Sequence, residues 1–359
     1  MTTTTDQIID ETRAAESTGR VLGDTSATAT LALTVIGDRL GLFRSLASDG
    51  PSTSAELAMR TGTQERYVRE WLAGMYAAGY LTHDATDGRF TLPGEHRPTL
   101  VDEPGPAFLP GVQQELDGAL ARLPQIIEAF QRGGGVAHEA FPDDLHIGVD
   151  RFTAMWHQHL LTQVWVPAVP AAEALLDAGC RVADVGCGSG RALVRLAQQY
   201  PGVVGRGYDV HAPSIDRARA LAAEAGLENQ VQFEVLDASL GLPEKYDVIT
   251  TFDVLHDAVD PQNLLRSIRE ALAPGGLYLC LDINCSESLD QNVGPVAALL
   301  YGFSVTYCMT TSLAHDGEGF GTLGLPPAVL DRYARAAGFT TVTKVDLDNP
   351  FKNLYVLRS

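Results

Sequence analysis

The second half of the chain begins with a short apolar run that ends in a cluster of glycines. Residues 182–185 are apolar apart from Asp184, and the run stops at the glycine turn 186–190 (GCGSG). Apolar residues then recur at helical spacing through 191–200. This order predicts a strand, a tight turn and a helix. Glycines let a ligand approach the backbone, and the first amides of a helix attract anionic or polar groups.

Three further apolar runs end in acidic or polar residues. Run 203–210 ends around Asp209 and run 231–237 ends in Asp237, whereas run 246–257 leads into a polar turn. An acid in the position of Asp209 can accept hydrogen bonds from both hydroxyls of a ribose. Asp237 is placed to meet an adenine amino group. The four runs therefore predict parallel strands whose ends surround a nucleoside.

The N-terminal third has helical spacing followed by a hairpin pattern. We expect a weakly helical arm over 6–22 and helices over 27–46, 55–61 and 64–78, with a capping box at 52–56. The expected apolar positions are Leu31, Val35, Leu40 and Phe43 in the second segment, and Tyr67, Trp71, Leu72 and Met75 in the last. Two short β-like runs around Asp87-Gly88 predict a hairpin over 80–92. Helix, turn, helix and hairpin together predict a winged helix.

The middle of the chain is expected to be helical over 104–132, with Leu116, Leu120 and Leu123 inward. A triple glycine at 133–135 interrupts it. Segment 152–160 is helical, rich in aromatic residues and histidines, and directly precedes the strand–turn–helix unit. We therefore take Met155, Trp156, His157 and His159 as candidate acceptor-pocket residues, with core packing the alternative for the first two. His157 and His159 point to different helix faces and cannot form an i, i+4 metal pair.

The C-terminal pattern completes an α/β sheet. A helix over 264–272 follows the cap Asp260-Pro261, and a fifth strand is expected over 277–283. Insertion 284–325 contains an apolar helix near 296–303 and a glycine-rich end at 317–324, which suggests a lid. Tyr307 and His315 in this insertion are further candidates for contact with an acceptor. A helix over 327–337 and strands over 340–347 and 353–357 close the chain.

Composition restricts the function classes. The 359 residues are enough for two domains, 45% are hydrophobic, and no apolar run approaches the ~20 residues of a membrane span. The N-terminus has no secretory pattern, so we expect a cytoplasmic protein without a membrane partner. The five cysteines form no Cys-x-x-Cys pair, so we expect reduced thiols and no metal. The alternative is a soft-metal thiolate site using Cys285 and Cys308.

The formal net charge of −19 opposes nucleic acid as the main partner. Within 51–97 five arginines face six acidic residues, a balance that does not make a phosphate-binding face. The winged helix has two interpretations, DNA binding or a dimerisation and substrate-capping module. We favour the second, with a homodimer held by the N-terminal helices through Leu31, Val35 and Phe43.

These motifs together resemble the class I S-adenosylmethionine-dependent methyltransferases, over roughly 171–359. A winged-helix start, the glycine turn and segment 252–257 (FDVLHD) are similar to a bacterial group of such enzymes, mostly of unassigned substrate. Plant-type O-methyltransferases share the layout but usually carry a different glycine turn and a catalytic histidine in a later motif. The resemblance implies S-adenosylmethionine as cofactor. The implied cofactor-binding residues are Asp184, Gly186, Cys187, Gly188, Gly190, Asp209, Val210, Asp237, Ala238, Phe252 and Asp253.

The expected fold class is α/β, a seven-stranded Rossmann-like methyltransferase sheet preceded by a mostly helical winged-helix domain. The expected domains are 1–135 for dimerisation, 136–170 as a helical connector and 171–359 for cofactor binding. The expected reaction is methyl transfer to an O, N or C atom of a small organic acceptor. Three alternatives remain: a dinucleotide-dependent dehydrogenase, a cofactor-binding protein with non-methylating catalysis, and a cofactor-sensing transcriptional regulator.

His256 is the expected general base, because it follows the fourth strand beside the expected sulfonium. A neutral imidazole with a pKa near ~6.5 takes a proton at neutral pH. Asp253 or Asp257 is expected to orient it. His157 and His315 are competing bases, and proximity without any base is the other hypothesis.

Overall fold

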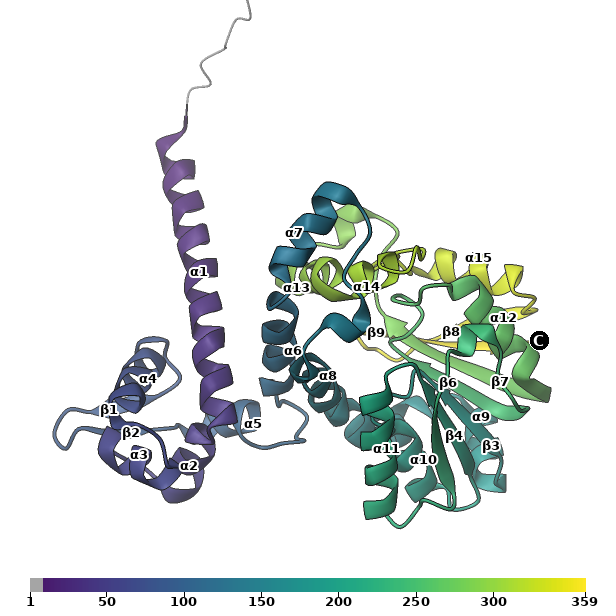
Figure 1. Cartoon of the computed structure of the whole chain (residues 1–359), viewed down its shortest axis with the longest axis horizontal. Coiled ribbons are helices and arrows are strands. Elements are labelled where there is room, and N and C mark those ends of the chain that lie inside the picture. Colours follow the sequence, from purple (N-terminus) through teal and green to yellow (C-terminus); the bar gives the residue numbers. More distant parts are fainter. Residues whose placement is uncertain (1–8) are drawn as a thin grey trace, which may run out of the picture. The chain divides into compact units, whose positions relative to one another are not determined.

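The computed structural model describes residues 9–359, which fall into two compact units divided between Gln113 and Gln114. Residues 6–8 of the expected N-terminal arm lie outside the described residues. The first unit contains these elements (Figure 1): α1 (Glu11–Arg39), α2 (Leu42–Asp49), α3 (Ser54–Thr61), α4 (Glu65–Ala77), β1 (Thr82–Asp84), β2 (Arg89–Thr91), the 3₁₀ turn η1 (Gly94–His96) and α5 (Arg97–Leu100). The order of these elements confirms the winged helix, and Thr53 with Glu56 forms the expected capping box before α3.

The expectation of a separate helix over 27–46 was wrong. One helix, α1, runs from Glu11 to Arg39, and α2 begins at Leu42. Gly41 adopts a left-handed φ of 69°, which ends the first helix and redirects the chain. Leu40, expected on the apolar face, is consequently 49% exposed.

Two of the three residues expected at a dimer interface lie instead in the core of the first unit. Phe43 is 1% exposed and packs edge-on against Trp71, with ring centroids 5.0 Å apart, and Val35 is buried with them. Leu31 is half-buried. In α4 the buried stripe uses Val68 where we expected Tyr67, which is 79% exposed. The winged helix therefore uses these apolar residues to form its own core.

The second unit opens with helices that lead to the sheet. They are α6 (Pro110–Leu120), which crosses the division, α7 (Leu123–Arg132), the 3₁₀ turn η2 (His138–Ala140), α8 (Asp143–Trp156), a π-helix η3 (His157–Trp165) and α9 (Pro170–Ala178). The single helix expected over 104–132 is thus two, because Pro124 in the first turn of α7 cannot continue a preceding helix. Leu123, expected inward, is 40% exposed.

A seven-stranded mixed sheet forms the centre of the second unit, as expected. Its order is β5 (Val231–Val235), β4 (Val204–Asp209), β3 (Arg181–Val185), β6 (Tyr246–Phe252), β7 (Leu272–Ile283), β9 (Lys352–Arg358) and β8 (Thr341–Val345). The first five strands are parallel, and β9 pairs antiparallel with β7 and β8. The carboxyl ends of the parallel strands therefore meet at one edge, where α/β sheets bind ligands.

Helices cover both faces of this sheet (Figure 1). On one face, η3, α9, α10 (Arg191–Gln199) and α11 (Ala212–Glu224) pack around residues such as Val248. On the other, α12 (Pro261–Ala271) and α15 (Pro327–Ala336) pack around its neighbour Ile249, with the 3₁₀ turn η4 (Ala238–Leu240) beside α12. Alternate residues of β6 thus face opposite layers, the pattern of a sheet buried on both sides.

The insertion between β7 and α15 is mostly helical. It contains the 3₁₀ turn η5 (Leu289–Gln291), α13 (Pro295–Phe303), the π-helix η6 (Ser304–Cys308) and α14 (Met309–Leu313). The continuous stretch Pro295–Leu313 is long and apolar enough to cross a membrane by length and composition, and 44% of it is buried within the chain. A core helix of a globular domain passes the same test, so this stretch is weak evidence for a membrane span.

Candidate functional site

The glycine turn connects β3 to α10, and its three glycines serve different purposes. A Cβ at Gly186 would lie 2.5 Å from a methyl of Val254, and one at Gly190 would lie 2.6 Å from the Phe233 ring. Gly188 has a left-handed φ of 51° and no atom within 4 Å of such a Cβ. Gly186 and Gly190 therefore permit close packing within the protein, whereas the backbone at Gly188 faces open space where a ligand can approach.

Asp209, at the end of β4, supports this turn from the neighbouring strand. Its Oδ2 accepts a hydrogen bond from the Gly188 amide at 2.8 Å, and its Oδ1 accepts one from the His211 amide at 2.8 Å. A carboxylate oxygen has two acceptor sites, so each oxygen keeps one for a ligand. Asp237 is held similarly, since its Oδ1 accepts from the amide and the hydroxyl of Ser239.

Asp184 is buried in β3 beneath the turn. Its Oδ1 accepts a hydrogen bond from Thr250 Oγ1 at 2.7 Å. Burial raises the pKa of this carboxyl to about 7, and the Thr250 hydroxyl opposes that rise. Asp184 therefore exchanges its proton near neutral pH, directly under the glycine turn.

Two cavities open at this edge of the sheet. The first, of about 170 Å³, is lined by Asp184, the turn residues 186–189 and Asp209, together with Trp156, His157, Trp165, Phe252, Asp253 and Tyr307. The second, of about 590 Å³, is lined by Asp209, Val210, Asp237, Ala238, Asp257 and His315. Gly186, Asp209 and Asp253 line both. The structure thus gathers all the expected cofactor residues except Gly190 around two adjoining cavities.

Aromatic rings form one side of the first cavity. Phe252 stacks on Trp165 at 5.9 Å between centroids and meets the His157 ring edge-on at 5.3 Å. Burial lowers the pKa of His157 to about 4, so its imidazole is neutral at pH 7. His157 Nδ1 and Trp165 Nε1 are buried and make no hydrogen bond to any described residue. This side of the cavity is therefore apolar with two unused polar atoms.

Asp253 follows the fourth expected strand in a constrained conformation. Its φ of 59° lies in the left-handed region that non-glycine residues rarely adopt. Lys352 Nζ, buried on β9, donates to Asp253 Oδ2 and lies 4.2 Å from the centroid of the Trp156 ring. Asp253 Oδ1 is buried and has no hydrogen-bond partner in the described chain. The carboxylate is thus fixed by one oxygen and keeps the other for a ligand.

His256 is 4% exposed and, among the described residues, is not part of the lining of either cavity. The expected orienting residues were wrong: its Nδ1 bonds Asp282 Oδ1 at 2.7 Å, and neither Asp253 nor Asp257 takes this role. Burial alone would lower the pKa of His256, but the Asp282 charge and hydrogen bond hold it well above the usual range. His256 is therefore a charged, buried imidazolium at neutral pH.

The remaining candidates divide between the cavities and their surroundings. Met155 is half-buried, His159 is exposed, and both lie outside the two linings. Tyr307 lines the first cavity and His315 the second. Sequence reasoning missed Asp150, which accepts bidentate hydrogen bonds from Arg191, both at 2.7 Å, and one from Ser189. It also missed Trp165 and Lys352. Of these residues, only Arg191 had a usable signal in the sequence, because it directly follows the glycine turn as the first residue of α10.

Two family models match the chain. A methyltransferase domain matches residues 176–308, and an Rv2258c-like winged HTH domain matches residues 27–101. The first match runs from α9 to η6 and covers the five parallel strands, the glycine turn, Asp209 and Asp237. The second covers the winged helix. The two models thus describe the same two parts that the patterns along the chain predicted.

Curated relatives match the second half of the chain. The ubiquinone biosynthesis O-methyltransferase of Ruegeria pomeroyi is 30% identical over 167 residues, which are 46% of this chain and 62% of that protein. The same enzyme of Aeromonas salmonicida is 30% identical over 180 residues, 48% of this chain and 71% of that protein. The chain therefore spans less than two thirds of the length of the first of these relatives.

Solved structures match nearly the whole chain at the level of the fold. PigF with SAH has a TM-score of 0.69 at 20% identity, covering 98% of this chain and all of the other. The mitomycin 7-O-methyltransferase MmcR has 0.69 at 17%, covering 97% and 100%, and human N-acetylserotonin methyltransferase in complex with SAM has 0.67 at 18%, covering both chains fully. These structures agree with the fold, and the domain match together with the curated relatives shows that the chain belongs to the S-adenosylmethionine-dependent methyltransferases, which move a methyl group from that cofactor to an acceptor.

Proposed function

We propose that this enzyme methylates a hydroxyl group of a small, partly aromatic acceptor. The observation that carries the proposal is the apolar side of the first cavity, where the neutral His157 lies against Phe252 and Trp165. Flat aromatic walls with few polar atoms are typical of sites for small organic ligands. The curated relatives and the mitomycin enzyme are O-methyltransferases, which supports oxygen as the nucleophile.

The described residues fit S-adenosylmethionine. The open backbone at Gly188 leaves room for its methionine part, and the free acceptor sites of Asp209 suit the ribose hydroxyls. Asp237 and Ala238 in the second cavity suit the adenine. When bound, the cofactor supplies an electrophilic methyl group on a sulfonium. Asp253, with one unused carboxylate oxygen, is the residue we propose to face that positive charge.

We propose that His157 orients the acceptor and accepts its hydroxyl proton. Its low pKa keeps it neutral and able to accept a hydrogen bond over the whole neutral range. Trp156 and Tyr307 complete the acceptor contacts in this proposal, and Met155 supports them from outside the cavity. His315 lines the second cavity, which we assign to the adenine, and is not an acceptor contact in this proposal. Displacement at a methyl group depends mainly on holding the acceptor atom in line, so positioning supplies most of the acceleration.

We propose that His256 does not accept a proton from the acceptor but holds neighbouring residues in place. An imidazolium has no lone pair with which to accept a proton, and the charge of Asp282 maintains that state. The pair instead connects the turn after β6 to the end of β7, beneath both cavities. In this proposal His256 is a positioning residue for Asp253 and Asp257. The role of general base, which we expected of His256 from the sequence, belongs to His157 instead.

We further propose a cytoplasmic enzyme without a nucleic-acid partner. All five cysteines are free and buried, in keeping with a reducing compartment. Of the five arginines in 51–97, four form ion pairs with carboxylates and Arg60 donates to the Gly50 carbonyl. These guanidinium groups are already engaged within the winged helix. That arrangement supports assembly or capping rather than phosphate contacts.

Labelled methyl transfer from S-adenosylmethionine to a panel of phenols, hydroxyquinones and amines tests the proposal. We expect label on the oxygen of at least one hydroxylated aromatic compound. His157→Ala should lower kcat by about 10²–10⁴-fold with cofactor affinity nearly unchanged. His159→Ala on the same π-helix, where the side chain is exposed, is the matched control. Label found only on amines, or equal kcat values in both variants, would reject the proposal.

A further inference from the structure

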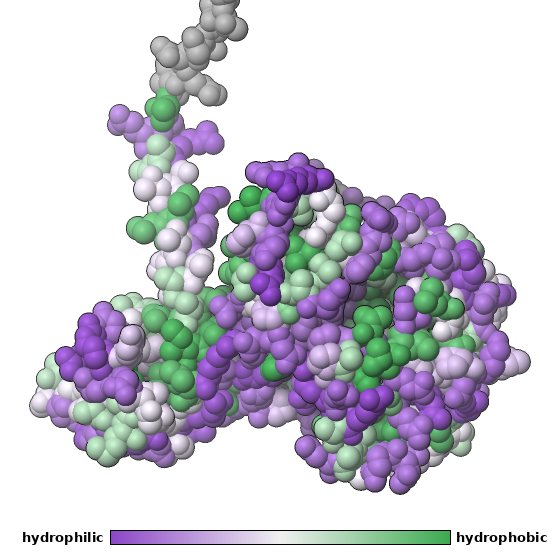
Figure 2. Space-filling model, viewed as in Figure 1, coloured by the Kyte–Doolittle hydropathy of each residue, from purple (hydrophilic) through white to green (hydrophobic). Residues whose placement is uncertain are grey.

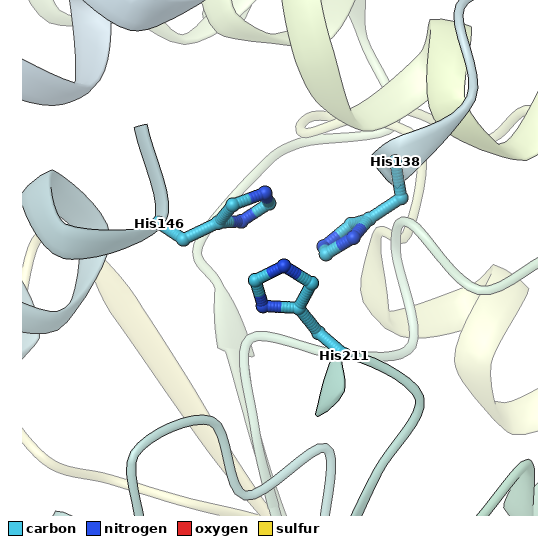
Figure 3. A group of neighbouring side chains, drawn as sticks. All are labelled: His138, His146 and His211. Atoms are coloured by element: carbon cyan, nitrogen blue, oxygen red, sulfur yellow. The ribbon is translucent and has the colours of Figure 1, made fainter. Parts of the chain in front are cut away.

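Three histidines from separate segments meet beside the first cavity (Figure 3). His138 comes from η2, His146 from α8, and His211 from the turn between β4 and α11. One ring nitrogen of each lies within 4.8 Å of one from both others. The ring centroids are 4.4 Å apart for His138 and His146, 5.2 Å for His138 and His211, and 4.0 Å for His146 and His211. No pattern along the chain brings these residues together.

The ring of His146 has a buried nitrogen that no described residue satisfies. The residue is 7% exposed, and its Nε2 is buried with no hydrogen-bond partner in the part of the chain that the structure describes. An unsatisfied buried polar atom costs about 1–3 kcal/mol. Two other imidazoles converge on the same place. A group that accepts electron pairs from several nitrogens would remove this cost.

The surroundings keep the three imidazoles neutral. Burial lowers the pKa of His138 and of His211, and it lowers that of His146 to about 3, with the other two rings contributing. All three nitrogens therefore carry free electron pairs at pH 7, the form that a metal ion requires. The carboxylate of Asp209 acts on His138 and His211, whereas the charge of Asp143 beside His146 and His211 is opposed by that of Arg217. The converging ring nitrogens and the unsatisfied Nε2 of His146 are therefore the main support for a metal ion at this place.

A neighbouring hydroxyl fixes the ring of His211. Its Nδ1 lies 2.8 Å from Ser214 Oγ, which also accepts from Arg217 at 2.9 Å. Arg217 is held in turn by Asp143 at 2.9 Å. Engagement of Nδ1 leaves Nε2 for the cluster. Histidine ligands of metal ions generally have their second ring nitrogen fixed in this way.

We propose that His138, His146 and His211 bind a divalent transition metal of the zinc class. Three neutral imidazoles suit Zn²⁺, Co²⁺, Ni²⁺ and Cu²⁺ better than Mg²⁺ or Ca²⁺, which prefer oxygen ligands. All three residues line the first cavity, so the ion keeps a fourth position open to a water or another oxygen ligand there. This proposal departs from our expectation of no metal. It does not depend on the proposed acceptor chemistry.

Metal titration of the untagged, chelator-treated protein without cofactor tests the site. We expect one Zn²⁺ per chain by calorimetry, and Co²⁺ absorption bands of a four-coordinate nitrogen site. His146→Ala and His211→Gln should each weaken Zn²⁺ binding by at least about 100-fold. His159→Ala, at an exposed position, should bind as the parent does. Melting curves recorded without metal verify that each variant is folded.

Several results would overturn the proposal. They are the absence of stoichiometric Zn²⁺ binding, an octahedral Co²⁺ spectrum, or equal affinity in the parent and both cluster variants. Each of these leaves methyl transfer untouched, because the titration uses no cofactor or acceptor. Conversely, an inactive enzyme that still binds one Zn²⁺ with the expected spectrum keeps the metal site and rejects the proposed acceptor.

Discussion

Burial and neighbouring charge give the histidines of this enzyme opposite protonation states. His157 has no carboxylate strong enough to offset its burial and stays neutral, whereas Asp282 keeps His256 protonated. Sequence position alone favoured His256, since it follows the strand that approaches the sulfonium. Its ion-pair partner lies on the next strand and was invisible in the sequence. Chemical role at this scale depends on contacts that only the fold creates.

Replacement of Asp282 by Asn should show what the pair contributes. The raised pKa of His256 stabilises the fold fully below its unfolded value of ~6.5, and this contribution is lost as pH rises through the folded value. The lowered pKa of Asp282 stabilises above its unfolded value of ~3.9 and is lost as pH falls through the folded value. The pair therefore contributes most between about pH 4 and 6.5.

We expect Asp282→Asn to cost about 3–5 kcal/mol near pH 6, because it removes one partner of a buried ion pair. The difference from the parent should shrink as the pH is raised toward 9. Urea unfolding at several pH values measures it. Asp290→Asn, at an exposed site in η5, is the control. A constant difference between pH 6 and 9 would contradict the assignment of a charged His256.

At the scale of elements, the apolar patterns along the chain predicted the helices and strands whose formation depends on neighbouring residues. The five parallel strands, the closing hairpin, the glycine turn and the two acids all lie where the apolar runs placed them. The prediction of one helix over 27–46 was wrong because Gly41 adopts a left-handed conformation and ends the helix within an otherwise continuous helical pattern. The cluster of His138, His146 and His211 was missed because 65 residues separate its last two members. Residues that meet only after folding, from distant segments of the chain, leave no periodic pattern in a single sequence.

Asp209 at the end of β4 supports the glycine turn that follows β3, so the two strand ends are expected to bind the cofactor together. The variant Asp209→Ala tests this expectation. The variant loses the proposed ribose contacts, at ~1.5–3 kcal/mol for hydrogen bonds to a charged group, and also the support of Gly188. We expect calorimetry to show S-adenosylhomocysteine binding at least about 10-fold more weakly. Asp216→Ala, exposed on α11, should change little. Unchanged affinity in the first variant would refute the ribose assignment.

Among the described residues of the first unit, the N-terminal part of the long helix α1 is exposed, whereas its C-terminal part packs against α2 and α4. Residues 11–29 of α1 are exposed throughout, and only its C-terminal part contributes to the core of the first unit. Green apolar residues interrupt the polar surface of this helix (Figure 2), among them Val21 at 62% and Leu22 at 68% exposed. Helices in proteins draw most of their stability from tertiary packing of an apolar face. We therefore propose that the exposed segment 11–29 of α1 holds a homodimer, and not the buried Val35 near the C-terminal end of the same helix or Phe43 of α2.

Light scattering coupled to size-exclusion chromatography tests this assembly. The parent should elute with twice the chain mass of 38.4 kDa. Leu22→Glu places a charge in the proposed apolar interface and should shift the protein to monomers, at a cost of several kcal/mol for an unpaired buried charge. Ala27→Glu adds the same charge about 140° away around α1, on another face of the helix, and should leave the dimer intact. A monomeric parent, or a dimer that survives Leu22→Glu unchanged, would show that α1 does not mediate assembly.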